Sequence, residues 1–193
     1  MVRSKTISSQ SIKNILTLRY NPTKNSLIPK KIWKDFVEKP VSNPVDFVED
    51  SIKSNIEHSI KNPKTKIAVA LSSGVDSTLV LALLKKTYPA IPISAISVKF
   101  AESIDESKYA AKIAHKFDAD HHILYIENFL AELPAAISII KQPFWDLHWY
   151  YIVKKAKTLS KFLVSGDGGD ELFGGYTFRY EKFLSLTTKN SSP

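Results

Sequence analysis

The chain has no cysteine among its 193 residues. Disulfide bonds, thiolate metal sites and a thiol nucleophile are therefore excluded. It also lacks any run that approaches the roughly eighteen consecutive apolar residues of a membrane-spanning helix, although hydrophobic residues make up 44% of the sequence. A chain of this length and composition can bury one sizeable core. We therefore expect one main domain in the cytoplasm, with short extensions and no membrane segment.

Acidic residues are missing from the start of the chain. Eight Lys or Arg residues and no Asp or Glu precede Asp35, whereas nineteen basic residues balance nineteen acidic ones in the rest. The net charge of +8 therefore belongs to the leading segment. A basic start of this kind resembles an organellar transit peptide, or an arm that binds RNA or an acidic surface. Nucleic-acid binding is disfavoured, because no interleaved aromatic residues are present to stack on bases.

Beyond this segment, apolar runs of strand length alternate with patterns of helical spacing. Strands are expected over 67–71, 93–100, 122–126 and 161–165. One amphipathic helix is expected from the helical spacing of Val45, Val48, Ile52, Ile56 and Ile60. Further helices are expected over 77–88, 103–117 and 147–159, together with a helical pair split by Pro134. This alternation predicts a three-layer, doubly wound α/β fold, in which helices cover both faces of a parallel sheet.

A turn rich in small and hydroxyl side chains joins the first expected strand to a helix. It reads Ser72-Ser73-Gly74-Val75-Asp76-Ser77-Thr78. Backbone N–H groups are unpaired at a helix start, the helix dipole adds partial positive charge, and Gly74 lets an anion approach the main chain. Asp76 would repel a phosphate chain unless a divalent cation lay between them. The turn therefore predicts a nucleotide bound with Mg²⁺, and the plainer alternative is an ordinary strand-to-helix connection.

A second unusual segment follows the last expected strand. It reads Ser165-Gly166-Asp167-Gly168-Gly169-Asp170-Glu171-Leu172-Phe173-Gly174-Gly175-Tyr176. Each glycine in a helix interior costs roughly 1 kcal/mol, so five glycines among three acids do not suit the middle of a helix. Glycines this dense indicate a main chain bent close to another group. Both segments follow strand ends, where ligands of doubly wound sheets bind, so they predict one shared site.

The two segments resemble known family signatures. Residues 72–77 are similar to the S-G-G-x-D-S loop of the N-type ATP pyrophosphatases, with Ser73 in place of the first glycine. Residues 165–176 resemble the S-G-D/E-G-S/G-D-E-L-F-G-G-Y signature of the asparagine synthetase family. Between these two segments, shorter blocks at 97–100, 105–110, 121–122 and 142–146 resemble family blocks in the same order. The resemblance therefore covers about residues 43–180.

This resemblance implies a fold and a domain organisation. The fold is the adenine nucleotide alpha hydrolase-like (PP-loop, HUP) type of doubly wound sheet. We expect an ATP pyrophosphatase domain over residues 43–186, preceded by a basic linker-like segment over 1–42 and followed by a flexible tail over 187–193. The basic start would then lie where the family has its interdomain linker.

The resemblance also implies ATP-dependent amide formation on the side chain of aspartate. The carboxylate attacks the α-phosphorus of ATP to give β-aspartyl-AMP and pyrophosphate, and ammonia then displaces AMP. Asp76 and Asp170 would hold Mg²⁺, and Asp167 would take a proton from ammonia. Leu71 and Val98 would flank the adenine, or belong equally well to the sheet core. The implied nucleotide contacts are Leu71, Ser72, Ser73, Gly74, Val75, Asp76, Ser77, Thr78, Val98, Ser165, Gly166 and Asp167.

The family pattern further predicts what the chain would need from partners. Asparagine synthetases usually carry a glutaminase domain with an N-terminal cysteine nucleophile, but this chain begins Met1-Val2-Arg3. The family's long helical region, which supplies a pyrophosphate-binding lysine, is not expected after Tyr180. A separate glutaminase or C-terminal subunit could provide these parts, and a homo-oligomer is also compatible with the sequence. Two alternatives stay open: a nucleotide-binding module without turnover, and a related adenylating ligase for another carboxylic acid.

Two further clusters allow more than one interpretation. An aromatic group either walls the amino-acid pocket or packs in the core or an interface. Adjacent His121 and His122 fall in an expected strand, where neighbouring side chains point to opposite faces, so joint metal binding is not expected. The aromatic group consists of Trp145, His148, Trp149, Tyr150 and Tyr151.

Overall fold

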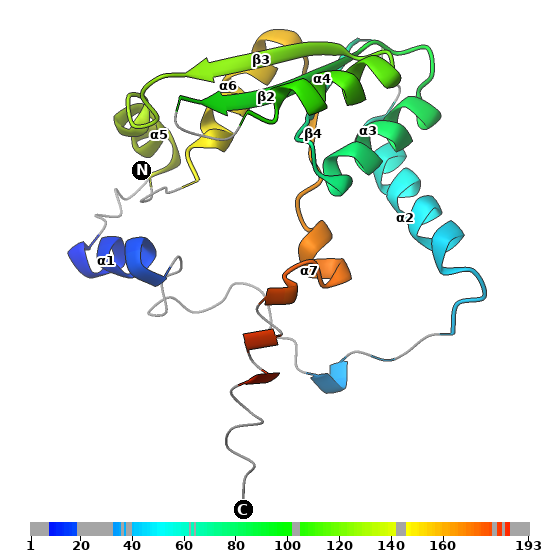
Figure 1. Ribbon diagram of the computed structural model, residues 1–193, viewed down its shortest axis with the longest axis horizontal. Helices are drawn as coiled ribbons and strands as arrows, with labels where there is room; N and C mark the ends of the chain where they lie inside the picture. Colours follow the sequence, from blue (N-terminus) through cyan, green and yellow to red (C-terminus); the bar gives the residue numbers. More distant parts are fainter. Residues whose placement is uncertain are drawn as a thin grey trace, which may run out of the picture.

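The computed structural model describes residues 8–18, 33–35, 37, 40–61, 63, 65–101, 105–141, 146–178, 181–182 and 184–185. They form a parallel four-stranded sheet with helices on both faces (Figure 1). The strands are β1 (Ile67–Ala70), β2 (Ile93–Phe100), β3 (Asp120–Ile126) and β4 (Leu163–Val164). The helices are α1 (Ser9–Leu18), the 3₁₀ turn η1 (Trp33–Asp35), α2 (Pro44–Ser59), α3 (Val75–Thr87), α4 (Ser107–Lys116), α5 (Leu133–Ile140), α6 (His148–Leu159) and α7 (Gly169–Phe173).

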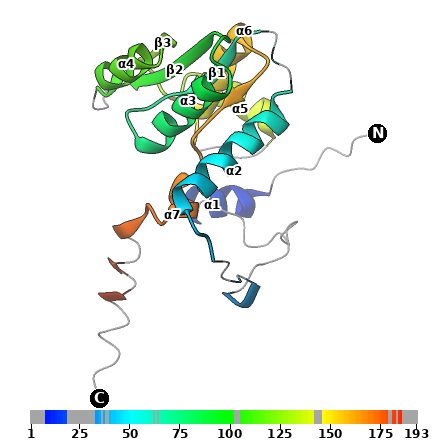
Figure 2. The ribbon, with the colours of Figure 1, turned by 90° about the vertical axis from the view of Figure 1, so that its right-hand side faces the viewer.

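The sheet has the strand order β3-β2-β1-β4. The chain crosses the sheet from β1 to β2 to β3 and then returns to place β4 on the other side of β1. In register, Val69 of β1 pairs with Ala95 of β2 and with Val164 of β4. The strand order therefore reverses next to β1, which confirms the predicted doubly wound arrangement. Helices α2, α3 and α4 cover one face of the sheet, and α6 covers the other (Figure 2).

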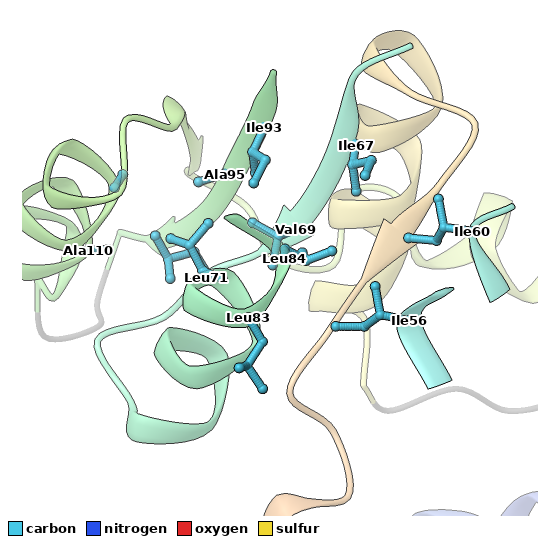
Figure 3. Packing of buried hydrophobic residues seen from close by; sticks show 12 residues of the cluster. Ile56, Ile60, Ile67, Val69, Leu71, Leu83, Leu84, Ile93, Ala95 and Ala110 are labelled. Atoms are coloured by element: carbon cyan, nitrogen blue, oxygen red, sulfur yellow. The ribbon is translucent and has the colours of Figure 1, made fainter. Parts of the chain in front are cut away.

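The main core lies between the sheet and helices α2, α3 and α4 (Figure 3). Val69 faces this side of the sheet, and Leu81 and Leu84 of α3 are fully buried against it. Ala68 of β1 instead faces α6, where it packs with Ile152. Because both faces of β1 are covered, its residues form a continuous apolar run rather than an alternating one. Each fully buried Leu or Ile contributes roughly 1.5–3 kcal/mol to stability.

Helix α2 confirms the amphipathic pattern predicted before the first strand, except in its first turn. Ile56 and, just beyond the helix, Ile60 are buried in the main core, whereas Val45 in the first turn is 72% exposed. The Asn43 side chain caps the helix by accepting a hydrogen bond from the Val45 N–H at 3.1 Å. The sequence therefore sets both where this helix begins and which face it buries.

Helix α4 begins later than the capping-box spacing predicted. It starts at Ser107, whose N–H donates to the Asp105 carboxylate at 3.0 Å. Ser103 and Ile104, the expected start, lie outside the described residues. Asp105 can end the preceding loop because a short carboxylate satisfies an N–H group two residues ahead.

Two other predictions around the sheet were wrong. Pro134 does not split two helices: it lies in the first turn of the single helix α5, where its missing N–H is not needed. Strand β4 pairs over two residues only, not over 161–165. Helix α1 and the turn η1 lie within residues 1–42, for which the basic linker-like segment stays a prediction. No helix in the described ranges has the length and apolar character needed to cross a membrane.

Candidate functional site

A cavity of about 400 Å³ opens beyond the carboxyl ends of the strands, where the strand order reverses. The ends of β1, β2 and β4 and the starts of α3, α4 and α6 contribute to its wall. Both sequence motifs follow strands that end here. Predicted nucleotide contacts that line the cavity are Leu71, Ser72, Ser73, Asp76, Ser77, Val98, Ser165, Gly166 and Asp167.

Hydroxyl side chains close the loop after β1 on itself. The buried Ser77 hydroxyl accepts a hydrogen bond from the Ser72 N–H at 3.1 Å and lies 3.0 Å from the Ser72 hydroxyl. The Ser72 hydroxyl in turn accepts from the Gly74 N–H at 3.1 Å, and the Thr78 hydroxyl donates to the Gly74 carbonyl at 2.8 Å. These bonds fix the loop from within, so its shape is built before any ligand binds.

The loop delivers the chain into the start of α3. Gly74 precedes the helix in an extended conformation, and no side chain caps the first turn. N–H groups of that turn are therefore available to an anion, with the helix dipole behind them. The Val75 side chain is 78% exposed. The described cavity wall does not include Gly74, Val75 or Thr78. These residues can act on a nucleotide only through their main-chain groups or by supporting the loop with their own hydrogen bonds.

A hydrogen-bond chain ties the end of β1 to β2 and, through it, to β3. Ser97 of β2 donates through its hydroxyl to the Leu71 carbonyl at 2.7 Å. The Nε2 atom of His121, on β3, lies 2.8 Å from the same hydroxyl. Because the Ser97 proton goes to Leu71, this geometry makes His121 Nε2 the donor. Burial, followed by the nearby charge of His122, lowers the pKa of His121 and favours the neutral ring.

Glycines bring the second motif against the first. All six glycines of the chain lie in the two motifs. A Cβ atom on Gly166 would lie 2.7 Å from the Ser77 nitrogen and 2.8 Å from the Asp76 carbonyl carbon. One on Gly169 would lie 2.5 Å from Cγ of Asp76. Only a residue without a side chain allows this approach, so the two segments are in direct contact.

The second motif then forms the short helix α7. Gly168 and Gly174 flank it with φ of 94° and 70°, conformations that favour glycine. The Asp170 carboxylate lies against Gly175, where a Cβ atom would come within 1.8 Å of Oδ1. Asp170 follows Gly169, the residue that touches the Asp76 carboxylate, but it is not part of the described cavity wall. The structure thus brings together the segments of Asp76 and Asp170.

The residues present fit Mg²⁺ only if the nucleotide supplies ligands as well. Carboxylate oxygens are what Mg²⁺ prefers, and Asp76 presents one into the cavity. Within the described ranges, however, no group of three or more His, Cys, Asp or Glu residues is arranged to hold a metal ion. This agrees with the usual Mg²⁺ sites of nucleotide enzymes, where one or two carboxylates act together with phosphates and water.

Electrostatics single out Asp167 at the cavity mouth. Partial burial raises the pKa of this carboxyl, a positive charge on His148 would lower it, and the negative charge of Asp146 raises it further. His148, the first residue of α6, also lines the cavity. Its Nδ1 atom lies 2.6 Å from Oδ1 of Asp146. The sequence-based prediction placed His148 only in an aromatic cluster, because the fold, not the spacing, brings it next to Asp167.

A second contact was also absent from the sequence-based prediction. Ser73, which stands where the pyrophosphatase loop has a glycine, donates its hydroxyl to the Glu106 carboxylate at 2.8 Å. Glu106 lines the cavity at the start of α4. The extra side chain of Ser73 therefore points to a partner on another element, thirty-three residues along the chain.

Some residues of the aromatic cluster line the cavity, and others pack in the core. His148 and Trp149 line the cavity, whereas Tyr151 is buried and donates its hydroxyl to the Phe129 carbonyl at 3.1 Å. Tyr150 packs with Tyr151 at the edge of the same core cluster, and Trp145 lies outside the described residues. Both interpretations of Leu71 apply. Its side chain is 4% exposed and packs in the main core, and the residue also lines the cavity.

The adjacent histidines of β3 behave as strand geometry predicts. His121 contacts Ser97, whereas the nearest charged atom to His122 Nε2 is Oδ2 of Asp120, at 3.1 Å. That approach lacks hydrogen-bond geometry, so Nε2 of His122 remains buried without a hydrogen bond in the described part of the chain. The two rings have different partners and do not form one metal site.

Comparisons with known proteins agree with this geometry. The sequence profile of the asparagine synthase family matches residues 52–192, past Tyr180 where the quoted motifs stop. A Mycobacterium tuberculosis protein assigned as a glutamine-hydrolysing asparagine synthetase is 31% identical over 78% of this chain and 24% of its own length. Asparagine synthetase 1 of Bacillus subtilis is 28% identical over 77% of this chain and 24% of its own. The chain thus spans about a quarter of the length of these relatives.

Similar solved structures support the assignment of the fold. A glutamine-dependent NAD⁺ synthetase from Acinetobacter baumannii, solved with ADP, superposes with a TM-score of 0.52 at 14% identity, over 73% of this chain and 29% of that one. A U34-tRNA thiolase from Methanococcus maripaludis gives 0.50 at 15% identity, over 72% and 50%. The fold is therefore the adenine nucleotide alpha hydrolase-like type. With a family match over more than half of its length that includes both motifs, the chain belongs to the asparagine synthase family.

Proposed function

We propose that this protein activates a carboxylic acid with ATP and transfers the acyl group to ammonia. In the proposed reaction, the side-chain carboxylate of aspartate displaces pyrophosphate from the α-phosphorus, and ammonia then displaces AMP from the acyl-adenylate. This is the finer form of the ATP-dependent amide chemistry of the family, and we expect it in the cytoplasm. Displacement at phosphorus depends mainly on alignment and on neutralised charge, both of which a preformed loop can provide.

The contact between the two motifs is the observation that carries the proposal. Gly166 lies against the main chain at Asp76 and Ser77, so the phosphate-type loop and the acidic segment share one cavity. This cavity lies at the reversal of strand order, the usual ligand position of doubly wound sheets. The loop's uncapped helix start suits the triphosphate, and the half-buried Val98 suits the adenine.

Asp167 is the proposed base for the attacking nitrogen. It lies at the cavity mouth, and partial burial raises the pKa of its carboxyl. A raised pKa makes a carboxylate a better proton acceptor near neutrality. Asp76 and Asp170 are the proposed Mg²⁺ ligands, together with phosphate oxygens. When bound, the ion neutralises charge on the departing pyrophosphate.

A second candidate function is a nucleotide-binding subunit that needs a partner for turnover. The charges of the cavity favour it: Asp76, Glu106 and Asp167 line the wall, and no Lys or Arg does so among the described residues. Mg²⁺ offsets part of this negative charge, but pyrophosphate release also benefits from a fixed cation. A glutaminase or another synthetase subunit could donate one. The remaining alternative, activation of a different acid, keeps the same site and changes only the acceptor.

Exchange of radiolabelled pyrophosphate into ATP tests these proposals. We expect exchange that requires both aspartate and Mg²⁺ and is lost in Asp76→Asn. ATP binding without exchange for any acid would select the nucleotide-binding subunit, and restored exchange on addition of a glutaminase or synthetase subunit would support that choice. Exchange with another acid would change the substrate only. Failure to bind Mg²⁺·ATP at all would refute the proposed function.

A further inference from the structure

The Asp146–His148 pair lies beside the proposed base. His148 lines the cavity from the first turn of α6, and its side chain keeps 36% of its surface exposed. Asp146 lies two residues earlier and holds Nδ1 at 2.6 Å. Asp167 lines the same cavity, close enough to His148 for the two charges to interact. Neither His148 nor Asp146 belongs to the two motifs from which the site was predicted.

The carboxylate contact fixes which ring nitrogen can accept a proton. Nδ1 faces a carboxylate, so in the neutral ring the proton lies on Nδ1 and Nε2 carries the lone pair. Nε2 is therefore the basic atom available to a ligand in the cavity. A carboxylate behind an imidazole also stabilises the imidazolium that forms when Nε2 takes a proton, which is the logic of other carboxylate–histidine pairs in catalysis.

Proton balance requires a second acceptor if ammonium is the form that reaches the site from neutral water. Ammonium carries four hydrogens and the product amide nitrogen carries two, so two protons must leave. The C–N bond forms with the nitrogen lone pair, the bond between the acyl carbon and the phosphate oxygen breaks, and AMP departs with that electron pair. A single carboxylate such as Asp167 can hold only one of the two protons.

We propose that His148 is a catalytic residue of the amide-forming step and accepts the second proton at Nε2, with Asp146 as its positioning residue. This inference rests on the proposed function. The first half-reaction, formation of the acyl-adenylate, releases no proton from an ionised acid and so does not need His148. The pair therefore separates the two half-reactions, which a purely structural role of the residue would not do.

Kinetics of the two half-reactions test the inference. In His148→Gln we expect pyrophosphate exchange within about twofold of the wild type and amide formation slower by about 100-fold, the scale of general base catalysis. Free imidazole should partly restore amide formation in His148→Ala, because the cavity has room for it. His115→Gln, on the exposed surface of α4, is the matched control and should change neither rate. Asp146→Asn should slow amide formation by about tenfold.

Three results would overturn the proposal. The first is amide formation in His148→Gln at the wild-type rate, and the second is loss of exchange and amide formation in the same proportion without rescue by imidazole. The third is independent of turnover: long-range proton–nitrogen NMR should find His148 protonated on Nδ1, and a neutral ring protonated on Nε2 would exclude the role. If the wild type shows no exchange, the proposed function fails on its own, and the NMR result still decides whether Nε2 of His148 is free to accept a proton.

Discussion

The loop after β1 and the segment after β4 meet in one cavity but are held in different ways. Residues 71–78 are fixed from within by the hydroxyls of Ser72, Ser77 and Thr78 and are anchored below by Ser97. Residues 165–175 are held instead by backbone hydrogen bonds, such as the one from the Gly175 N–H to the Asp170 carbonyl at 2.9 Å. Glycines place that segment: Gly166 and Gly169 let it touch Asp76, and Gly168 and Gly174 turn it with positive φ.

The difference suggests that the two segments have different roles toward a ligand. A loop closed by its own hydrogen bonds presents N–H groups at fixed positions, which suits a ligand of fixed shape such as a phosphate chain. A segment positioned by shape complementarity depends on its partner for its place, and it carries the acidic groups that we propose act on the ligand. The acidic segment should therefore fail when its contact with the loop is lost, whereas the loop should tolerate the loss of a single bond.

The largest expected effect is on the contact itself. Gly166→Ala forces a Cβ atom to within 2.7 Å of the Ser77 nitrogen, so the two segments must separate. We expect stability to fall by about 1–3 kcal/mol and ATP affinity by about 100-fold. Denaturant unfolding and calorimetric titration with Mg²⁺·ATP measure both quantities.

Gly168 supplies the matched control for this variant. A Cβ atom at Gly168 meets nothing within 4 Å, although its φ of 94° is strained for alanine. Gly168→Ala should therefore lose stability by about 1–2 kcal/mol with a much smaller change in affinity. Equal loss of ATP affinity in the two variants would contradict the glycine contact as the cause.

The second effect concerns charge in the cavity. Asp76→Asn keeps the shape of the side chain but removes a ligand charge, so Mg²⁺-dependent ATP affinity should fall on the order of 10- to 100-fold. Asp170→Asn should match it if both carboxylates share the ion, and a wild-type result would leave Asp76 as the ligand. His122 lies near the amino end of β3, away from the carboxyl ends of the strands. His122→Ala therefore serves as the control and should bind ATP normally. Unchanged affinity in both aspartate variants would refute the metal assignment.

A smaller effect compares two buried serines of β2. Ser97→Ala removes the bond to the Leu71 carbonyl and leaves that acceptor unpaired, so we expect a loss of about 1–2 kcal/mol and a few-fold weaker ATP binding. Ser94 is fully buried, and its hydroxyl has no hydrogen-bond partner among the described residues. Ser94→Ala should therefore be neutral or slightly stabilising. The opposite order in urea unfolding would show that Ser97 does not anchor the loop.

The smallest expected effect is on the pH dependence of stability. Burial lowers the pKa of His121 from its ordinary 6.5, so above that pH the ring is neutral in both folded and unfolded chains. As pH falls below about 6.5, the unfolded chain binds the proton first and stability decreases until the lower native pKa is reached. Urea unfolding of the wild type and His121→Gln between pH 8 and pH 5 should show this decrease only in the wild type. A parallel loss in both would assign the dependence to other groups.

Most of the fold could be predicted because local patterns and tertiary packing agree. The run from Ile93 to Phe100 forms β2 over the predicted residues, and buried Ile56 and Ile60 follow the helical spacing. Predictions failed where tertiary pairing decides the boundary. Strand β4 is cut short because only two of its residues find partners on β1, and α4 starts late because Asp105 satisfies the first N–H group.

The candidate site was predictable mainly where it is contiguous in sequence, with Val98 of β2 as the one predicted nucleotide contact outside the two motifs that lines the cavity. The motif residues from Leu71 to Ser77 and from Ser165 to Asp167 could be assigned because small residues and acids concentrate there. His148 reaches the cavity from α6 and lies outside every quoted motif. Ser97 and Glu106 reach it from β2 and α4 and lie in the shorter family blocks, but those blocks did not predict their contacts with Leu71 and Ser73. Their roles follow from the strand order, which only the folded chain defines.

Paramagnetic NMR with Mn²⁺·ATP tests most directly whether the two motifs form one nucleotide site. A chain of 21.7 kDa gives resolvable amide spectra after isotope labelling. We predict that signals from residues 71–78 and 165–170 broaden together, while those at the amino ends of the strands, such as Ile93 and Asp120, stay sharp. Broadening confined to one motif, or centred on the amino ends of the strands, would contradict a shared site.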